Sequence, residues 1–581
     1  MDTMGQGLRD GRSAYEQRAG PSCPLGFSSR RSVPATGTDL FALGQHPSAT
    51  FAELGRAARY ERMMPMLQVK NLTLTHRKDL TSLIENLSFT LNPGDRAAII
   101  GEEGNGKSTL LKLLYDPGLV EDYIDYTGEI IGGNCRKGYL AQELPPETMS
   151  LPVWEFCQAR PAFQEADPRE LDRCARQVGL DAALFWDDRK LSTLSGGERV
   201  KLRLGLLLLE SPDLLLLDEP SNDLDLQTVE WLEGFLLARK VPVLYISHDE
   251  GLLEKTANLV IHLERLYRRT TPRCTVERTS YRDYVDRRGA AFAHQEQQAK
   301  KERAEYSAKM ERFRQIRDKV DHAQAHVAKY NSAGIPNPSE GRLLKKKMHA
   351  VLSMGRRFER EKENMTALPE WEEAILTAFD PEKSSLPAGK TVLRLDLPTL
   401  TAGERVLAQN ARLWVTGPEH VGIIGANGVG KSTLLKLVAG ELLPRTDIRA
   451  AYMAQDYGDQ LLGGQTPVDI LAPSGHKNDI TRARNLLGSM KYKTEEMEHP
   501  ASDLSGGQRA KLLFLAMVLR GANVLLLDEP TRNCSPLSAA VIREVLAQFP
   551  GCIISVSHDR KYLEEVCTRV LELTPDGLRE A

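Results

Sequence analysis

The residues most able to do chemistry stand in two copies of one glycine-rich pattern. Residues 101–109 read GEEGNGKST and residues 425–433 read GANGVGKST, so both copies match G-x4-G-K-S. Glycines at this spacing let backbone N–H groups turn inward around phosphate oxygens, at the positive end of the following helix. Lys107 and Lys431 would meet the β- and γ-phosphates of ATP, and Ser108 and Ser432 would hold Mg²⁺. The predicted nucleotide-binding residues are Gly101, Gly104, Asn105, Gly106, Lys107, Ser108 and Thr109 in the first copy, and Gly425, Asn427, Gly428, Gly430, Lys431, Ser432 and Thr433 in the second.

An acidic pair follows each glycine-rich loop at the end of an apolar run. LLLLDEP places Asp218 at a strand end, where its carboxylate can bind Mg²⁺, and the adjacent Glu219 can act as general base toward water. Asp528 and Glu529 repeat the pair. A histidine lies 30 residues beyond each aspartate and can hydrogen-bond the γ-phosphate, and a glutamine before the pair can sense that phosphate or the metal. The predicted catalytic residues are Glu219, Glu529, His248 and His558, and the predicted metal ligands are Ser108, Gln142, Asp218, Ser432, Gln455 and Asp528.

A third repeated motif supplies another anion site. LSGGERVKLRL begins at Leu194 and LSGGQRAKLLF at Leu504, and both place glycine N–H groups at the start of a helix. The predicted residues are Ser195, Gly196, Gly197, Ser505, Gly506 and Gly507. Because each nucleotide already has its glycine-rich loop, a second anion site per repeat implies that two repeats close over each ATP.

These motifs recur in the same order, and each copy is predicted to fold as an α/β unit. Ser195 and Asp218 are 23 residues apart, as are Ser505 and Asp528. Runs such as DLLLLDE and VLYISHD are apolar on both faces, which is typical of a covered parallel sheet. We predict a 1–65 tail or misassigned start, a first repeat at 66–270, a linker at 271–375 and a second repeat at 376–581.

The motif set resembles that of ATP-binding cassette proteins, with two P-loop cassettes in tandem. In that family cassettes pair head to tail. The resemblance therefore implies two composite sites, each with ATP and Mg²⁺ as cofactors. Site one would join the loop, acidic pair and histidine of the first repeat to Ser505 and Gly507. Site two would join those of the second repeat to Ser195 and Gly197.

The two copies depart from the family pattern at two places. The first loop carries Glu102 and Glu103 where the family often has small or amide residues, and we expect both side chains to point to solvent. The segment after the first acidic pair reads SNDLD, with Asp225, whereas the second copy reads TRNCSP and lacks that aspartate. In the head-to-tail pairing this second segment would serve site one.

Between the repeats, the sequence predicts a long basic helical hairpin. Tyr306, Met310, Phe313 and Val320 recur at helical spacing, and after NSAGIPNPSEG the pattern resumes with Leu344, Met348, Val351 and Phe358. We expect two packed arms, the first near 45 residues long. The second arm carries six cations without acidic neighbours, which is typical of phosphate-backbone binding. The predicted RNA-binding residues are Arg342, Lys345, Lys346, Lys347, Arg356 and Arg357.

Two cassettes, a basic helical linker and no apolar run of about 20 residues resemble the ABC-F subfamily. This resemblance implies a cytoplasmic ATPase on the ribosome. ATP would close the cassettes with the linker against tRNA and rRNA, and hydrolysis would release them. Translation would be modulated, or the ribosome protected from antibiotics. Since the cassettes would pair within one chain, we expect a monomer.

Other readings of the same motifs differ in the partner. A fused ATPase subunit of a membrane transporter would carry the same cassettes, but the basic hairpin would then have no explanation. DNA-repair ATPases carry zinc modules or longer coiled coils. The iron–sulfur ribosome-recycling ATPase needs a cysteine-rich N-terminus, and this one has only Cys23.

The missing aspartate predicts unequal sites, with site one the slower. Glu529→Gln, which disables site two, should therefore reduce ATP turnover more than Glu219→Gln does. Steady-state phosphate release from the two single variants measures this difference. Equal losses would contradict the asymmetry.

Overall fold

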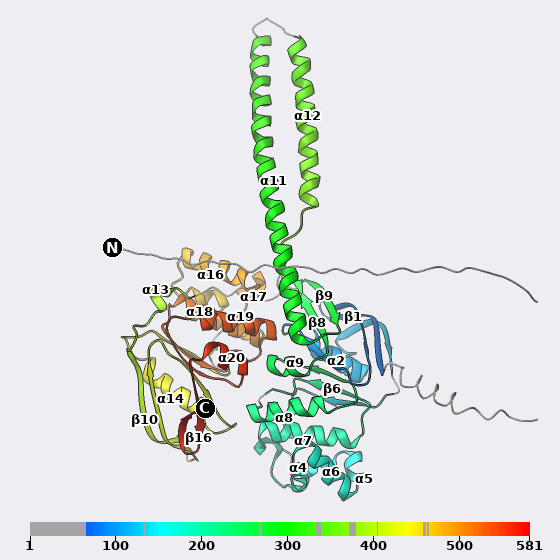
Figure 1. Ribbon diagram of the computed structural model, residues 1–581, viewed down its shortest axis with the longest axis vertical. Helices are drawn as coiled ribbons and strands as arrows, with labels where there is room; N and C mark the ends of the chain where they lie inside the picture. Colours follow the sequence, from blue (N-terminus) through cyan, green and yellow to red (C-terminus); the bar gives the residue numbers. More distant parts are fainter. Residues whose placement is uncertain are drawn as a thin grey trace, which may run out of the picture. The chain divides into compact units, whose positions relative to one another are not determined.

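The computed structural model describes residues 66–581 except 133–134, 223, 267–269, 333–337, 371–378, 404, 457–459 and 462–463 (Figure 1). The predicted tail at 1–65 and residues 333–337 of the predicted break between the hairpin arms lie outside the described residues. Among the described helices, none is both long and apolar enough to span a bilayer.

The first repeat is built on a six-stranded sheet in the order β5-β6-β7-β3-β8-β9. Strands β5 to β8 pair in parallel, and β9 joins β8 antiparallel. A separate antiparallel sheet has the order β2-β1-β4. The strands are β1 (Leu67–His76), β2 (Ser82–Leu91), β3 (Arg96–Ile100), β4 (Ile124–Ile131), β5 (Lys137–Leu140), β6 (Leu214–Asp218), β7 (Val243–Ile246), β8 (Leu259–Arg265) and β9 (Thr271–Glu277). The helices are α2 (Lys107–Tyr115), α3 (Pro146–Met149), α4 (Val153–Gln158), α5 (Pro161–Glu165), α6 (Pro168–Val178), α7 (Gly196–Leu209), α8 (Leu226–Leu237) and α9 (Glu250–Thr256).

The second repeat has the same sheet order, β13-β14-β15-β12-β16-β17, with a hairpin of β10 and β11 beside it. Its strands are β10 (Thr391–Ala402), β11 (Arg405–Thr416), β12 (His420–Ile424), β13 (Ala450–Met453), β14 (Val524–Asp528), β15 (Cys552–Val556), β16 (Arg569–Thr574) and β17 (Gly577–Glu580). Its helices are α13 (Pro381–Ser384), α14 (Lys431–Leu442), α15 (Pro467–Leu471), α16 (Lys477–Ser489), α17 (Thr494–Glu498), α18 (Gly506–Leu519), α19 (Pro536–Ala547) and α20 (Arg560–Val566). The predicted α/β fold with two tandem P-loop units is confirmed.

Apolar residues on both faces of the central strands hold the helices to each sheet. In β6, Leu214 and Leu216 join the core around α2, whereas Leu215 and Leu217 join the core around α8 and α9. Side chains alternate between the two faces of a strand, so an uninterrupted apolar run serves both cores. All five residues of β6 are buried, and the run ends at Asp218.

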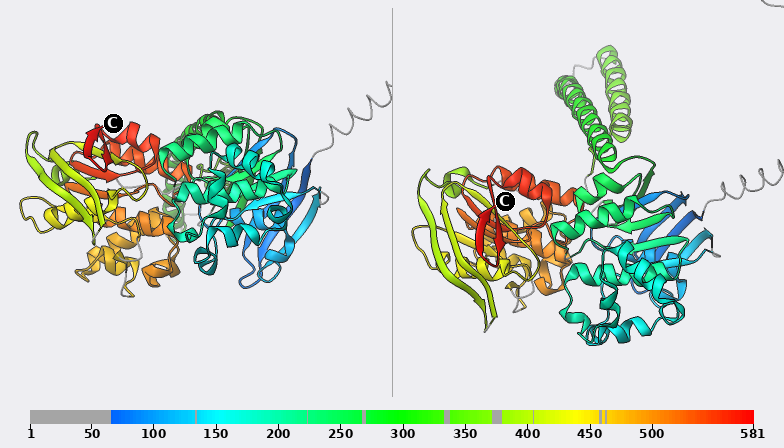
Figure 2. Two further views of the ribbon diagram at one scale, coloured as in Figure 1. Left: turned by 90° about the horizontal axis from the view of Figure 1, so that it is seen from below. Right: turned by 60° about the horizontal axis from the view of Figure 1, so that its bottom comes forward.

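The linker forms the predicted hairpin, with α11 (Tyr281–Ser332) and α12 (Pro338–Glu363) side by side in Figures 1 and 2. Helix α11 has 52 residues, about 78 Å at 1.5 Å per residue, so it exceeds the expected 45. It is longer because its first turns, with Tyr281 and Tyr284, belong to the core of the first repeat. Farther out, the rings of Phe313 and Phe358 pack edge to face, 5.6 Å apart.

Val351 tests this packing because it is 4% exposed between the arms, whereas its neighbour Leu352 is 55% exposed. Val351→Asp would bury an unpaired carboxylate at a cost of ~2 kcal/mol. That cost should raise the open fraction of the hairpin, and its rate of tryptic cleavage, roughly thirtyfold. Mass spectrometry of the fragments gives the rates. Leu352→Asp is the matched control, and equal rates for the two variants would contradict the packing.

Candidate active site

Each glycine-rich loop leads into a helix, α2 or α14, and its lysine folds back over the loop. Gly106, before α2, has φ of 84°, a conformation that glycine adopts without steric cost. Lys107 Nζ donates to the carbonyl oxygens of Gly101 at 2.7 Å and Glu102 at 3.0 Å. Lys431 makes the equivalent contacts in its own loop at 2.9 and 3.1 Å. Both ammonium groups therefore lie among backbone groups that can surround phosphate.

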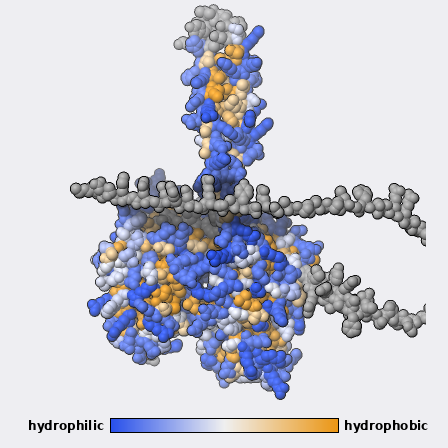
Figure 3. All heavy atoms as spheres, in the orientation of Figure 1, coloured by the Kyte–Doolittle hydropathy of each residue, from blue (hydrophilic) through white to orange (hydrophobic). Residues whose placement is uncertain are grey.

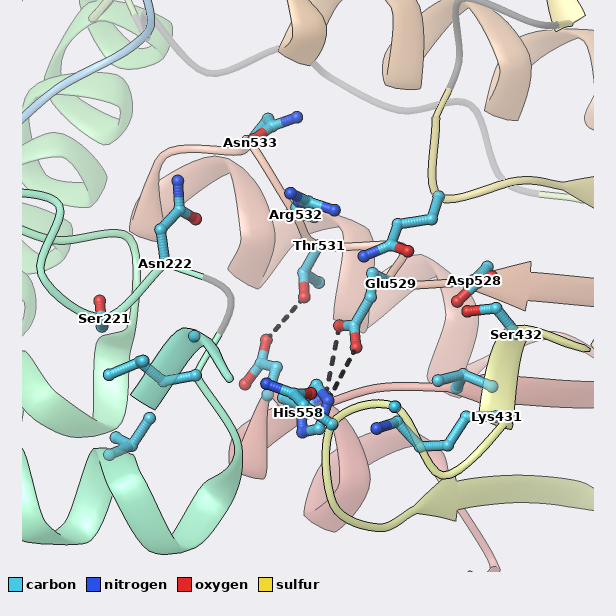
Figure 4. A pocket seen from close by; sticks show the side chains of 18 of the residues that line it. Ser221, Asn222, Lys431, Ser432, Asp528, Glu529, Thr531, Arg532, Asn533 and His558 are labelled. Carbon is cyan, nitrogen blue, oxygen red and sulfur yellow. Dashed lines mark hydrogen bonds and ion pairs between the residues drawn. The ribbon is translucent and has the colours of Figure 1, made fainter. Parts of the chain in front are cut away.

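The predicted serine and aspartate metal ligands lie together in each repeat. Ser108 Oγ donates to Asp218 Oδ1 at 2.9 Å, and Ser432 lies beside Asp528 in Figure 4. Both oxygens of Asp528 are buried without a hydrogen-bond partner among the described residues. Burial raises the pKa of both aspartates. A divalent cation would satisfy these carboxylates, and hydroxyl and carboxylate oxygens are ligands that Mg²⁺ prefers, so the residues fit a magnesium ion.

Glu219 is surrounded by polar side chains of its own repeat. Its carboxylate accepts from Gln142 Nε2 at 2.9 Å and from Asn222 Nδ2 at 3.0 Å, and lies 3.1 Å from His248 Nε2. Its φ of 49° places a non-glycine residue in the left-handed region, which is typical of functional positions. Burial opposes ionisation, but the hydrogen bond and charge of His248 hold the pKa of Glu219 below its ordinary value. An ionised carboxylate is what a general base requires.

Glu529 has the same backbone conformation, φ 53°, but a different electrostatic environment. Its Oε1 lies 3.7 Å from His558 Nε2, and its Oε2 accepts from the His558 backbone N–H at 3.3 Å. Burial and the like charge of Asp528 raise the pKa of Glu529 to about 8. Burial and the charge of Lys431 lower the pKa of His558 to about 4. Gln455, which matches Gln142, is exposed in the pocket described below. The two glutamates therefore differ in charge near neutral pH.

Each predicted signature motif begins a helix, α7 or α18. Ser195 and Ser505 are the N-cap residues and accept the backbone N–H of Glu198 and Gln508 in reciprocal capping boxes. The serine hydroxyls thus accept hydrogen bonds within their own helices. The N–H of Gly507, by contrast, faces the first repeat.

One pocket of about 700 Å³ combines the second loop with parts of the first repeat (Figure 4). From the second repeat it is lined by Asn427, Gly428, Gly430, Lys431, Ser432, Thr433, Gln455, Asp528, Glu529 and His558, and from the first by Gly196, Arg199, Ser221 and Asn222. A second pocket joins Gln142, Asp218 and Glu219 to Arg532 and Asn533 of the second repeat. The first pocket therefore joins Gly196 of the first signature motif to the second glycine-rich loop, whereas Ser195 and Gly197, the residues predicted for site two, are not among its lining residues.

Glu102 and Glu103 do not point to solvent, so that expectation was wrong. Glu102 is 6% exposed, and its carboxylate accepts from Lys511 Nζ at 3.2 Å and from Ser535 Oγ at 2.7 Å. Glu103 Oε2 accepts from the backbone N–H of Gly507 at 3.0 Å. All three partners belong to the second repeat. The carboxylates are turned inward because that repeat supplies a cation and hydrogen-bond donors for them.

Charged side chains also join α8 and α9 of the first repeat to α19 and α20 of the second. Arg543, 2% exposed, contacts Glu250 at 2.5 Å, and Lys561 lies 3.2 Å from the same carboxylate. Arg560 pairs with Glu233. Acidic residues stand on the first repeat and basic residues on the second, so the faces are complementary in charge.

Several contact residues were missed from the sequence. Tyr139 donates to Asp218 Oδ2 at 3.3 Å, and the carbonyl oxygen of Cys534 lies 2.5 Å from His248 Nδ1. A signal existed for the tyrosine, since Tyr139 and Tyr452 both stand three residues before the repeated glutamine. No side-chain pattern could indicate a backbone carbonyl from the other repeat.

The six predicted RNA-binding cations all lie exposed on α12. None forms an ion pair with any residue the structure describes. Figure 3 shows hydrophilic side chains over the hairpin beside apolar ones, and the exposed apolar residues there include Leu343 and Leu352. Helix α12 thus presents unopposed positive charge.

Comparisons with known proteins agree with this geometry. The family model for ABC transporters matches residues 84–222 and 408–532, once in each repeat. The putative ATP-binding protein YdiF of Bacillus subtilis is 29% identical, over 89% of this chain and 81% of its own. ABC transporter F family member 2 of Arabidopsis thaliana is 27% identical, over 86% of this chain and 75% of its own. The chain is a tandem ATP-binding cassette ATPase, similar to proteins of the ABC-F type.

Solved structures share the arrangement at lower identity. The archaeal ribosome recycling factor aABCE1, solved with ribosomal stalk protein aP1, aligns with a TM-score of 0.54 at 17% identity. The alignment covers 88% of this chain and 90% of that one. At this identity the likeness establishes the tandem-cassette fold.

Glu103 generates a prediction about ATP affinity. Its carboxylate holds the N–H of Gly507, a group that site one would direct at the γ-phosphate. Glu103→Asn, which copies Asn427 of the second loop, should therefore lower KM for ATP several-fold in a Glu529→Gln background. The reciprocal Asn427→Glu in a Glu219→Gln background should raise it. An unchanged KM in both backgrounds would show that the contact does not compete with nucleotide.

Proposed function

We propose that this chain is a cytoplasmic, monomeric ATPase that acts on the ribosome. ATP binding closes the two cassettes, α12 contacts rRNA or tRNA, and hydrolysis releases the protein. The outcome for the ribosome is modulated translation or protection from antibiotics. The observation that carries the proposal is the exposed, unopposed positive charge of α12 on a hairpin joined to an ATPase.

The charge of the linker favours a nucleic-acid backbone as its partner. Residues 281–365 hold 20 Lys or Arg and 12 Asp or Glu, although the whole chain has a formal charge of −3. Lys345, Lys346 and Lys347 are consecutive and therefore point to several sides of α12. Such an arrangement suits phosphates on more than one strand and carries no base-reading pattern, which favours a structured RNA recognised by its shape.

The root of the hairpin offers a route from nucleotide to RNA. Asn105, in the first glycine-rich loop, donates to the carbonyl oxygen of Leu263 on β8 at 2.9 Å. The next residue, Glu264, is buried and accepts from Arg288 of α11 at 2.7 Å. A change in the loop can therefore reach α11 through β8 and a buried ion pair.

The hydrolysis step follows from the site residues. Lys107 and Lys431 bind phosphate oxygens, and the ionised carboxylate of Glu219 takes a proton from the attacking water. Glu529 can do the same only in its ionised form, which its raised pKa disfavours near neutral pH. Mg²⁺ held by the loop serine and the strand-end aspartate of each repeat would neutralise charge on the phosphates. His248 orients Glu219, since its Nε2 lies 3.1 Å from that carboxylate.

Two names among the similar proteins support the ribosome as partner. One similar structure is a ribosome recycling factor, and another is described as ribosome-bound archaeal Pelota and ABCE1. Those descriptions concern other proteins, and their extension to this chain rests on the shared tandem cassettes and the basic linker.

The test uses a chain with Glu219→Gln and Glu529→Gln, which should bind ATP without hydrolysing it. We expect it to pellet with ribosomes through a sucrose cushion only with ATP, and to be released steeply as salt rises. Lys345, Lys346 and Lys347 all changed to Gln should weaken pelleting at least tenfold at moderate salt. The matched control changes Arg303, Arg312 and Arg314 of α11, which are also exposed, and removes the same charge.

Absence of pelleting under every condition would overturn the ribosome proposal. Equal effects of the lysine and arginine sets would instead reject α12 as the specific contact. Thermal unfolding of each variant, with and without ATP, separates both outcomes from a general loss of folding.

A further inference from the structure

The two composite sites differ in where their interface carboxylate comes from. Aligning the repeats places Glu102 opposite Ala426 in the glycine-rich loops, and Asp225 opposite Ser535 in the segment after the acidic pair. Site two therefore combines Asp225 with an alanine-bearing loop, and site one combines Ser535 with a glutamate-bearing loop. Each site has one carboxylate among these aligned positions, and both belong to the first repeat: at site two it stands in the segment after the acidic pair, and at site one in the glycine-rich loop.

At site two the carboxylate belongs to the first repeat and acts on the second loop. Asp225 caps α8 by accepting the N–H of Thr228 at 3.0 Å. Burial opposes its ionisation, but its hydrogen bonds to Thr228, with the charges of His558 and Lys431, lower its pKa. The charge of Lys431 in the second repeat thus favours the ionised form of Asp225 in the first repeat.

At site one the carboxylate stands in the glycine-rich loop and reaches toward the segment after the acidic pair of the second repeat. Glu102 reaches from its loop to Lys511 on α18 and to Ser535 and Ser538 at the start of α19. Burial opposes its ionisation, but the charge of Lys511 and these hydroxyl groups lower its pKa to about 2. The Glu102 carboxylate is therefore ionised, and these three partners all belong to the second repeat.

Both repeats carry a lysine at this position, but the two lysines have different partners. Lys511 is 5% exposed, and Glu102 is its carboxylate partner. Lys201, at the same position in the first repeat, lies 4.9 Å from the ring of Trp231 and is only half-buried. A buried ammonium requires a paired anion, so the differences between the repeats at 102 and 535 compensate each other, and Glu102 also pairs with the buried Lys511.

We propose that Glu102 is a positioning residue of site one, which supplies from the loop side the charge that Asp225 supplies at site two. Its carbonyl oxygen accepts from Lys107 Nζ at 3.0 Å, while its carboxylate grips the second repeat. Contact between the repeats therefore fixes the backbone that holds the phosphate-binding lysine. This inference rests on the ATPase activity and is independent of ribosome binding.

The test moves the carboxylate across the interface and measures kcat and KM for ATP, with site two disabled by Glu529→Gln. Glu102→Ala leaves Lys511 buried without its partner, and Ser535→Asp sets two carboxylates against each other. Each single change should lower kcat at least about tenfold. The pair Glu102→Ala with Ser535→Asp rebuilds the arrangement of site two and should recover kcat to within about threefold of the parent.

Two further measurements separate positioning from a general structural effect. In the Glu219→Gln background, where only site two turns over, Glu102→Ala should cause a smaller loss than it does at site one. Glu102→Gln keeps the shape of the side chain and should fold normally by thermal unfolding, yet lower kcat at site one. A double variant no better than the worse single variant would overturn the proposal, as would equal losses at both sites.

Discussion

Everything at the two sites depends on parallel strands whose carboxyl ends meet at one edge of a sheet. In the first repeat β3 leads to the glycine-rich loop, β6 ends at Asp218, and β7 is followed by His248. The order β5-β6-β7-β3 makes these strands neighbours, so residues over 140 positions apart in the sequence converge at one edge. The apolar faces of β6 keep that edge in place, because helices cover both sides.

Both pockets are lined by residues of the two repeats, and the surfaces where the repeats meet are complementary in charge. The first repeat offers carboxylates on α8 and α9, and the second offers Arg543, Arg560 and Lys561. Next to this complementary surface, Glu102 and Glu103 bind groups of the second repeat. The lack of an aspartate at position 535 therefore does not leave this contact without a carboxylate. At site one a carboxylate of the glycine-rich loop, Glu102, lies against Ser535, whereas the relative rates of the sites remain a prediction.

Burial and charge pairing also hold the linker. Its root is buried, with Tyr284 hydrogen-bonded to His262 at 2.7 Å and Arg288 paired with Glu264. Its outer part is held by an apolar seam between α11 and α12, which includes Phe313 and Phe358, and by the ion pair of Lys309 with Glu361. The cations of α12 stay outside this seam. A stiff helix with a fixed base and a charged far arm can carry a movement of the cassette to a distant phosphate backbone.

The sequence alone determined the local chemistry of this protein. Glycine spacing, apolar runs ending in Asp-Glu and helix-start motifs are short-range signals, because each arises from residues that are close along the chain. They were sufficient to predict two P-loop cassettes and a basic hairpin, and the tandem α/β fold agrees. The tertiary structure alone decided the direction of Glu102 and Glu103, the pairing of His248 with the Cys534 carbonyl and the difference between Glu219 and Glu529. Those features depend on groups some 30 to more than 400 residues away, and burial and charge act through space, which no local pattern records.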